Sequence, residues 1–508
     1  MASIASGILI GTSYIPFPPW AVFFCFVPLW SYWHRLIDRD KNIKKIFWSG
    51  WLTQFIFTII GFHWIAHTTV EFGHLPYFVG VLAVIGYSSF ASLHVPISGV
   101  IWGLIQKRWP LRPLVSIFTL ALVYGFCEIL WPTIFPWNLG YMWLWNHWIG
   151  FQSADIWGFQ GLSILTLIMN GLFLVAVNLR RKPLMMALPL SMAVFLFLGI
   201  QWVGSFELAQ LPTPDRKIKP LVVQANIGNL EKYLAERGNQ FRDGIMDKYF
   251  DLTRRGLQQY PDSDLVLYPE TAMPISLDPY FLGLFHNRKF QDFVLETKKP
   301  FLTGAYSEDP MRLKVYNGMF LFDETAKFLG LYRKTILLAF GEYLPGGELL
   351  PFLKKVVPEI SDFKRGTGPT ILQLKDLKIG PLICYEGLYP WFTGELARRG
   401  AQIFVNVTND SWFGTDFEPY QHMTMTFART IEYRRPMVRV TNTGITTAVL
   451  ADGTVLEKSP LVTEWFHQFD VDYSSTPPTT FYEQWGEYLL WLVGLIIVTL
   501  VFLGRRKT

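Results

Sequence analysis

The sequence has few charged residues, and this shortage excludes an ordinary soluble protein. Charged side chains make up 17% of the 508 residues, whereas a soluble globular chain carries about a quarter. Hydrophobic residues reach 51% and aromatic residues 17%, so we expect much of the chain to lie in a bilayer with Trp and Tyr at its interfaces. The net charge of +5 is small for this length. Since no basic segment carries a nucleic-acid motif, no nucleic-acid partner is expected.

Cysteine is also scarce. The three residues Cys25, Cys127 and Cys384 are too few and odd in number, so a disulfide framework is excluded. Cys25 and Cys127 lie in apolar runs, where a thiol acts as a small buried hydrophobe. Cys384 instead ends an apolar run and precedes polar residues, which makes it the candidate for chemistry. No cleavable signal peptide is expected, because no basic region precedes the first apolar segment.

Apolar stretches dominate the first 210 residues. Each approaches the roughly 20 residues that span a bilayer, and they cover 2–15, 19–33, 47–67, 77–106, 113–132, 160–180 and 185–205, with an eighth at 488–503. The sequence therefore predicts a membrane domain of about seven transmembrane helices over 1–210. A polar folded domain over 211–480 follows, and then a C-terminal transmembrane helix with a basic tail over 481–508.

Basic residues follow every second apolar stretch. They cluster at 34–45, 107–112, 180–182 and 505–507, whereas the intervening connections are aromatic and rich in Pro. Cytoplasmic loops carry the excess of Lys and Arg, so the pattern predicts eight spans with both termini in the cytoplasm. The folded domain would then lie on the opposite, periplasmic face of a bacterial inner membrane.

The segment 211–480 alternates between short apolar runs and helical patterns. Runs of Val, Ile, Leu and Phe predict buried strands, at 220–224, 263–268, 301–305, 378–383 and 402–407. Helical patterns cover 242–259 and 423–433, and Asp452-Gly453 predicts a hairpin turn. This alternation predicts a layered α/β sandwich.

Polar side chains come directly after several predicted strands, where open α/β sheets usually place their sites. Glu270 follows one strand, Lys334 a second, and Cys384 ends a third. A polar cluster at 405–414 follows a fourth. Taken singly, these features have ordinary explanations as a helix-capping acid, a solvated lysine, a buried cysteine and an Asx turn.

Taken together, these segments resemble the nitrilase superfamily, whose pattern is Glu, Lys and Cys in this order. The flanking words are similar to one membrane-bound branch, the apolipoprotein N-acyltransferases. They are YPET, RKTILLAFGEYLP, CYE, NVTNDSWFG, PYQHMTMTFARTIEYRRPMVRVTNTGIT and the DG turn, with FPWNLGY in the membrane part. The resemblance covers the whole chain. It implies a multi-span α-helical membrane domain plus an extracytoplasmic, nitrilase-like αββα sandwich.

The three residues have complementary chemistry. The thiolate is the reactive form of Cys384, and a carboxylate such as Glu270 within reach takes the thiol proton as general base. The ammonium of Lys334 stabilises the thiolate and the oxyanion of a tetrahedral intermediate. The amide N–H of Tyr385 is a second candidate oxyanion donor.

The resemblance also implies supporting roles for Glu342, Tyr385 and Glu386. Glu342 either supports Lys334 or helps to transfer a proton, and the sequence leaves both roles open.

The resemblance has one departure, near the residues that would position the substrate. Tyr233 stands seven residues after Asn226, where the family carries a functional Trp. Tyr233, Asn409 and Trp412 are the candidates for positioning the substrate.

The resemblance implies a ping-pong reaction. Cys384 takes an acyl chain from a membrane phospholipid, typically phosphatidylethanolamine, and passes it to the α-amine of a diacylglyceryl-cysteine on an apolipoprotein. No metal and no organic cofactor is required, and we expect a monomer.

Two other functions stay open on the sequence. One is a membrane-anchored amide hydrolase of the nitrilase type, for which a single anchor would be enough. The other is a non-catalytic receptor for lipids or lipoproteins, against which the intact set of Glu270, Lys334 and Cys384 counts.

Overall fold

The computed structural model describes residues 1–40, 42–73, 75–311, 314–344 and 363–505. Of the sequence features above, Lys41, Pro345, Arg506 and Lys507 lie outside these ranges. The chain divides into two compact units. The first contains Met1–Ala66, Phe78–Leu211 and Thr480–Thr508, and the second contains His67–Tyr77 and Pro212–Thr479.

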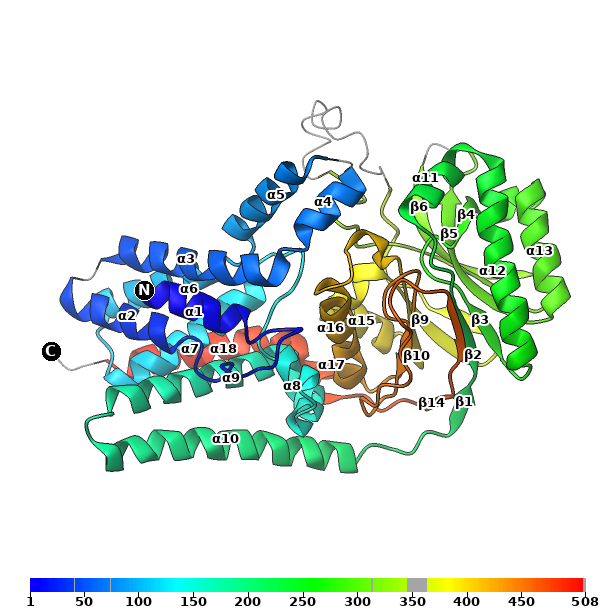
Figure 1. Cartoon of the computed structure of the whole chain (residues 1–508). Helices are drawn as coiled ribbons and strands as arrows, with labels where there is room; N and C mark the ends of the chain where they lie inside the picture. Colours follow the sequence, from blue (N-terminus) through cyan, green and yellow to red (C-terminus); the bar gives the residue numbers. More distant parts are fainter. Residues whose placement is uncertain (41, 74, 312–313, 345–362, 506–508) are drawn as a thin grey trace. The chain divides into compact units, whose positions relative to one another are not determined.

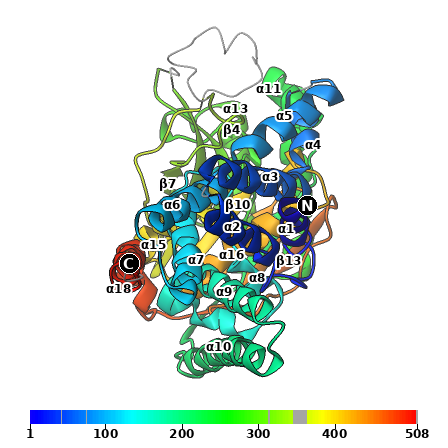
Figure 2. The same cartoon turned by 90° about the vertical axis from the view of Figure 1, so that its left-hand side faces the viewer.

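The N-terminal part and the C-terminal end of the chain are helical (Figures 1 and 2). The helices are α1 (Ala2–Gly11), α2 (Val27–Arg39), α3 (Ile43–Phe62), α4 (Ile65–Gly73), α5 (Tyr77–Phe90), α6 (His94–Arg108), α7 (Pro113–Leu130), α8 (Tyr141–Trp145), α9 (Ala154–Asn178), α10 (Pro183–Ala209), α17 (Phe481–Trp485) and α18 (Leu489–Leu503). Pro113 and Pro183 begin α7 and α10, a position where the missing N–H of Pro leaves no helical bond unmade.

Among the described residues, five helical segments are long and apolar enough to cross a membrane. They are Tyr77–Arg108, Pro113–Leu130, Ile149–Asn178, Pro183–Ala209 and Phe481–Leu503. The apolar helix α1 has only 10 residues, about half the usual length of a span. The count of eight spans and their orientation stay predictions.

Several helix boundaries differ from the predicted stretches, most clearly in two of them. The run predicted at 19–33 consists of turns up to residue 26, and α2 begins only at Val27. Two prolines just before this run and a third at its first residue, Pro16, Pro18 and Pro19, restrict the backbone against helix. The stretch predicted at 77–106 is two helices, because the chain turns at residues 91–93.

The second unit is built on two large sheets. One has seven strands, in the order β13-β2-β3-β5-β6-β7 with β4 beside β5, and the other has five, in the order β12-β11-β10-β9-β8. The strands are β1 (Arg216–Ile218), β2 (Pro220–Gln224), β3 (Leu265–Leu267), β4 (Met273–Ser276), β5 (Phe301–Glu308), β6 (Val315–Phe322), β7 (Phe328–Arg333), β8 (Leu372–Leu374), β9 (Leu377–Ile383), β10 (Ile403–Thr408), β11 (Met437–Thr441), β12 (Thr447–Val449), β13 (Trp465–Gln468) and β14 (Val471–Tyr473). β1 and β14 form a separate antiparallel pair.

The two sheets face each other between two layers of helices (Figure 1). The helices of this unit are α11 (Asn229–Arg237), α12 (Asn239–Gln259), α13 (Phe285–Thr297), α15 (Pro390–Arg398) and α16 (Glu418–Tyr433). A buried apolar core that includes Val223, Phe290 and Phe301 joins the seven-stranded sheet to α12 and α13. Gln224 of β2 links the sheets by accepting a hydrogen bond from Thr441 of β11 at 3.0 Å.

Strand direction determines where the site lies. β2, β3 and β5 run parallel in one sheet, and β9, β10 and β11 run parallel in the other. The carboxyl ends of neighbouring parallel strands therefore meet at one edge of each sheet. The Asp452-Gly453 turn closes a hairpin in which Val449 lies opposite Val455. The predicted α/β sandwich with an apolar helical part is confirmed.

Candidate active site

Three predicted site residues meet at strand ends drawn from both sheets. Glu270 lies just past β3, Lys334 directly follows β7, and Cys384 directly follows β9. The Nζ atom of Lys334 is 3.1 Å from Oε1 of Glu270. Glu270 is 6% exposed, Lys334 1% and Cys384 4%, so a charge in this site is little screened by water.

Cys384 has a backbone conformation that is uncommon outside glycine. Its φ is 54°, and a non-glycine residue in this left-handed region costs of order 1–3 kcal/mol. The residue starts a short 3-10 helix, Cys384–Leu388. Burial and the charge of Glu270 raise the pKa of the thiol well above its ordinary value, and Lys334 opposes them. The resting protein therefore holds a thiol that needs a base to remove its proton.

Lys334 lies between two carboxylates. Its Nζ is 2.8 Å from a carboxylate oxygen of Glu342, in addition to its contact with Glu270. Burial alone would lower the pKa of Lys334, but the two carboxylates outweigh it and hold this pKa well above its ordinary value. Glu342 is held in turn by the backbone N–H of Leu338 at 2.9 Å. The lysine is therefore a fixed cation.

Glu386 connects residues 334–336, which we call the lysine loop, to the 3-10 turn Cys384–Leu388, which we call the cysteine turn. Its Oε1 accepts hydrogen bonds from Tyr332 Oη at 2.6 Å and from the backbone N–H groups of Thr335 and Ile336 at 2.7 and 3.0 Å. Its Oε2 accepts from the N–H of Ile383 at 2.8 Å. Burial raises the pKa of this carboxyl to about 7, although the bonds from Tyr332, Ile336 and Ile383 and the charge of Lys334 oppose the shift.

The sequence did not indicate two residues beside this set. Asn317, in the middle of β6, donates through Nδ2 to Oε1 of Glu270 at 2.6 Å and to Oε1 of Glu342 at 3.1 Å. Lys232, on α11, reaches the backbone oxygen of Glu270 at 3.5 Å and Thr271 Oγ1 at 3.3 Å. Asn317 thus joins the two carboxylates that flank the lysine.

The remaining predicted residues lie at different distances from this centre. The backbone N–H of Asn409 donates to Oε2 of Glu270 at 2.9 Å. Trp412 is half-buried in a 3-10 turn just beyond it. Tyr385 points its hydroxyl to Oε1 of Glu418 at 2.5 Å. Tyr233 lies in α11, and its side chain is outside the described part of the chain.

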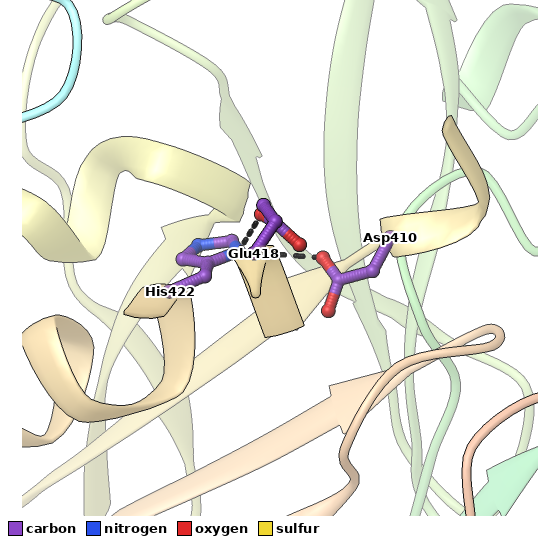
Figure 3. Close-up of side chains that lie close together, drawn as sticks. All are labelled: Asp410, Glu418 and His422. Atoms are coloured by element: carbon purple, nitrogen blue, oxygen red, sulfur yellow. Dashed lines mark ion pairs between the residues drawn. The ribbon is translucent and has the colours of Figure 1, made fainter. Parts of the chain in front are cut away.

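A second buried group of titratable side chains lies nearby. One ligand atom from each of Asp410, Glu418 and His422 falls within 4.8 Å of the others (Figure 3). However, Nη2 of Arg439 is 2.7 Å from Oδ2 of Asp410 and 3.2 Å from Nδ1 of His422. A guanidinium at this position repels a metal cation, so we interpret the group as an ion-pair network.

Comparison with known proteins assigns the class of the second unit and then the family of the chain. Residues 208–479 match the carbon-nitrogen hydrolase family, and residues 6–172 match the apolipoprotein N-acyltransferase N-terminal domain. The chain is 45% identical to an apolipoprotein N-acyltransferase of Bdellovibrio bacteriovorus, over 99% of this chain and 93% of that protein. It is 29% identical to one of Geobacter metallireducens, over 100% and 96%. The chain belongs to the apolipoprotein N-acyltransferase family, which confirms the resemblance and its assignment as an enzyme.

A solved structure is also similar. It is a carbon-nitrogen hydrolase from Helicobacter pylori, at 16% identity and a TM-score of 0.39, which covers 57% of this chain and 96% of that one.

Proposed function

We propose that this enzyme transfers a fatty acyl chain from a membrane phospholipid to the N-terminal α-amine of a lipoprotein, through a thioester on Cys384. One observation carries the proposal. In a chain related over its full length to apolipoprotein N-acyltransferases, the buried Glu270, Lys334 and Cys384 come together at the strand ends of a carbon-nitrogen hydrolase domain.

In the first half-reaction the thiol of Cys384 attacks an ester carbonyl of the phospholipid. Glu270 takes the thiol proton as the carbon–sulfur bond forms, and the cation of Lys334 stabilises the oxyanion of the tetrahedral intermediate. The ester carbon–oxygen bond then breaks, and the lysophospholipid leaves with the proton from Glu270. The acyl chain remains on sulfur as a thioester.

In the second half-reaction the α-amine of a diacylglyceryl-cysteine attacks this thioester. Glu270 accepts a proton from the amine as the carbon–nitrogen bond forms, and the carbon–sulfur bond breaks. The proton returns to sulfur, so the thiol of Cys384 is regenerated and the product is an amide. This chemistry needs no metal and no organic cofactor.

The contacts around the three residues support these roles. Glu342 and Glu270 keep Lys334 cationic, and the N–H of Asn409 fixes one oxygen of Glu270.

Both substrates are anchored in lipid, so a site at the bilayer surface raises their effective concentration. We therefore place the enzyme in a bacterial inner membrane, with its catalytic domain on the periplasmic face and phosphatidylethanolamine as the donor.

Intact-mass spectrometry of the purified enzyme tests the proposal. After incubation with phosphatidylethanolamine, the protein should gain one acyl chain, which peptide analysis should locate on Cys384. The adduct should persist until a diacylglyceryl lipopeptide with a free α-amine is added, and the lipopeptide should then gain the chain. The variant Cys384→Ala should gain nothing.

Other outcomes distinguish the competing functions. Rapid loss of the adduct as free fatty acid, without an acceptor, would indicate a hydrolase. A wild-type protein that binds the lipid but never forms an adduct would indicate a receptor. An adduct that survives in Cys384→Ala would show that another residue is the nucleophile.

A further inference from the structure

Four charged side chains form a buried cluster next to the nucleophile. They are Asp410, Glu418, His422 and Arg439, which we call the ion cluster, and each is almost fully buried. Nδ1 of His422 lies 3.3 Å from an oxygen of Asp410 and 3.3 Å from an oxygen of Glu418 (Figure 3). Burying ionisable groups is costly unless they are paired and hydrogen-bonded, and those of the ion cluster bond to one another and to the residues around Cys384.

One contact runs from the ion cluster to the backbone of Cys384. Nη1 of Arg439 donates to Oδ1 of Asn406 at 2.6 Å. Nδ2 of Asn406 in turn donates to the carbonyl oxygen of Cys384 at 3.0 Å. The guanidinium therefore orients the amide that holds the strained residue.

A second contact runs to the residue after the nucleophile. The hydroxyl of Tyr385 donates to Oε1 of Glu418 at 2.5 Å. The ring of Tyr385 stacks on the imidazole of His422, with centroids 4.3 Å apart and planes 1° from parallel. The first residue of the turn beyond Cys384 is thus fixed by two members of the ion cluster.

A third contact runs from the ion cluster to Thr408, the neighbour of Cys384 on the next strand. The hydroxyl of Thr408 donates to Oδ1 of Asp410 at 2.9 Å. In the parallel pair of β9 and β10, Val407 lies opposite Ile383, so Thr408 comes beside Cys384, and its hydroxyl lowers the pKa of the thiol. Thr408 is fully buried at the end of β10. Its single hydroxyl proton has two acceptors, the carboxylate and the sulfur.

We propose that the ion cluster supports the 3-10 turn Cys384–Leu388 and that Thr408 is a further catalytic residue, whose hydroxyl donates to the sulfur when Cys384 becomes a thiolate. The thiol proton goes to Glu270, and the hydroxyl proton stays on Thr408 and only changes its acceptor. Asp410 then keeps Arg439 and His422 as its partners. The inference rests on the proposed function only in calling Cys384 the nucleophile of acyl transfer.

The charges that face Cys384 fit this arrangement. Glu270 and Asp410 oppose a thiolate, whereas Lys334 and the hydroxyl of Thr408 favour it. Burial alone would raise the pKa of Asp410, but Arg439 and His422 outweigh it and hold this pKa below its ordinary value. Asp410 is thus an ionised group with strong partners of its own. The Thr408 hydroxyl is therefore able to turn from Asp410 to the sulfur of Cys384.

A matched pair of variants tests the role of Thr408. Thr408→Val replaces the hydroxyl by a methyl group of similar size, whereas Thr408→Ser keeps the hydroxyl. The readout is the rate at which iodoacetamide alkylates Cys384, measured by peptide mass spectrometry over a series of pH values. We expect Thr408→Val to react roughly 10-fold more slowly at neutral pH, the effect of losing a hydrogen bond to a charged group, with its profile moved to higher pH. Thr408→Ser should follow the wild type.

Equal profiles for Thr408→Val and the wild type would overturn the inference. Equal slowing in Thr408→Val and Thr408→Ser would also overturn it, because the cause would then be packing. Should Thr408→Val fail to fold, Thr408→Ala removes the hydroxyl without adding a methyl group and carries the same expectation. Alkylation needs neither lipid nor lipopeptide, so its result stands even if the wild type forms no acyl adduct and the proposed function fails.

Discussion

The substitution Glu386→Gln would disturb the link between the lysine loop and the cysteine turn while changing hardly any volume. The carboxylate accepts from four donors, three on one oxygen and the N–H of Ile383 on the other. An amide has one oxygen and one NH₂ group. With its oxygen toward the three donors, Gln would direct its NH₂ at the N–H of Ile383, and that buried donor would lose its partner.

The expected change in the free energy of unfolding follows from the hydrogen bonds and the charge that the substitution removes. Leaving one buried donor unpaired costs about 1–3 kcal/mol, and the three remaining bonds become neutral and roughly half as strong. The neutral amide also escapes the burial cost of the carboxylate, whose pKa burial raises to about 7, so we expect the free energy of unfolding at pH 8 to change by no more than about 2 kcal/mol. The effect on the reaction should be larger, because a displacement of about 1 Å in a catalytic group can slow the chemistry roughly 100-fold.

The assay is the single-turnover rate of acyl-adduct formation on Cys384, with the unfolding temperature measured on the same sample. Glu395→Gln is the matched control, because Glu395 is a partly exposed acid on α15 that pairs with Arg399 at 2.8 Å. Loss of a surface pair costs about 0–1 kcal/mol, so the control should react at the wild-type rate. A Glu386→Gln variant that forms the adduct at the wild-type rate would show that Glu386 does not position the catalytic groups.

Three further predictions concern the same centre. Asn317→Ala removes the donor shared by Glu270 and Glu342, and should slow adduct formation roughly 10-fold; a wild-type single-turnover rate would contradict this. Lys334→Met leaves the two carboxylates without their cation and should lower the free energy of unfolding by about 3–5 kcal/mol, with no adduct in mass spectra; a stable variant that acylates normally would remove Lys334 from the mechanism. Burial raises the pKa of Glu386 from 4.5 to about 7, so the folded state binds this proton more tightly than the unfolded state. The free energy of unfolding should therefore fall as pH rises between these values, by roughly 3 kcal/mol, and thermal unfolding of Glu386→Gln should lack this slope.

The strand ends that carry the site could be predicted from the sequence. Glu270 and Cys384 each follow a short run of fully buried apolar residues, and parallel neighbours bring such ends to one edge of a sheet. The sequence leaves the role of Glu342 open between support of Lys334 and transfer of a proton. The structure places its carboxylate 2.8 Å from Lys334, a contact that only the folded loop reveals.

Other residues at the site could be found only after folding. Asn317 and Arg439 each lie among apolar residues within a strand, a signal that marks a buried polar contact but does not name its partner. Lys232 lies in a helix rich in charged residues, where a solvated lysine has the same pattern. The stretch predicted at 19–33 begins well before α2, which starts at Val27. Apolar content alone does not distinguish a helix from a series of buried turns.

In the proposed reaction the acyl chain passes through Cys384 to a lipoprotein amine. The most direct measurement begins with acyl-enzyme that has been separated from phospholipid. It is then mixed with a diacylglyceryl lipopeptide that has either a free or an acetylated α-amine, and both masses are followed in time. We expect the chain to leave Cys384 and to appear as an amide on the free-amine lipopeptide alone. Loss of the chain at equal rates with both lipopeptides, as free fatty acid, would contradict it.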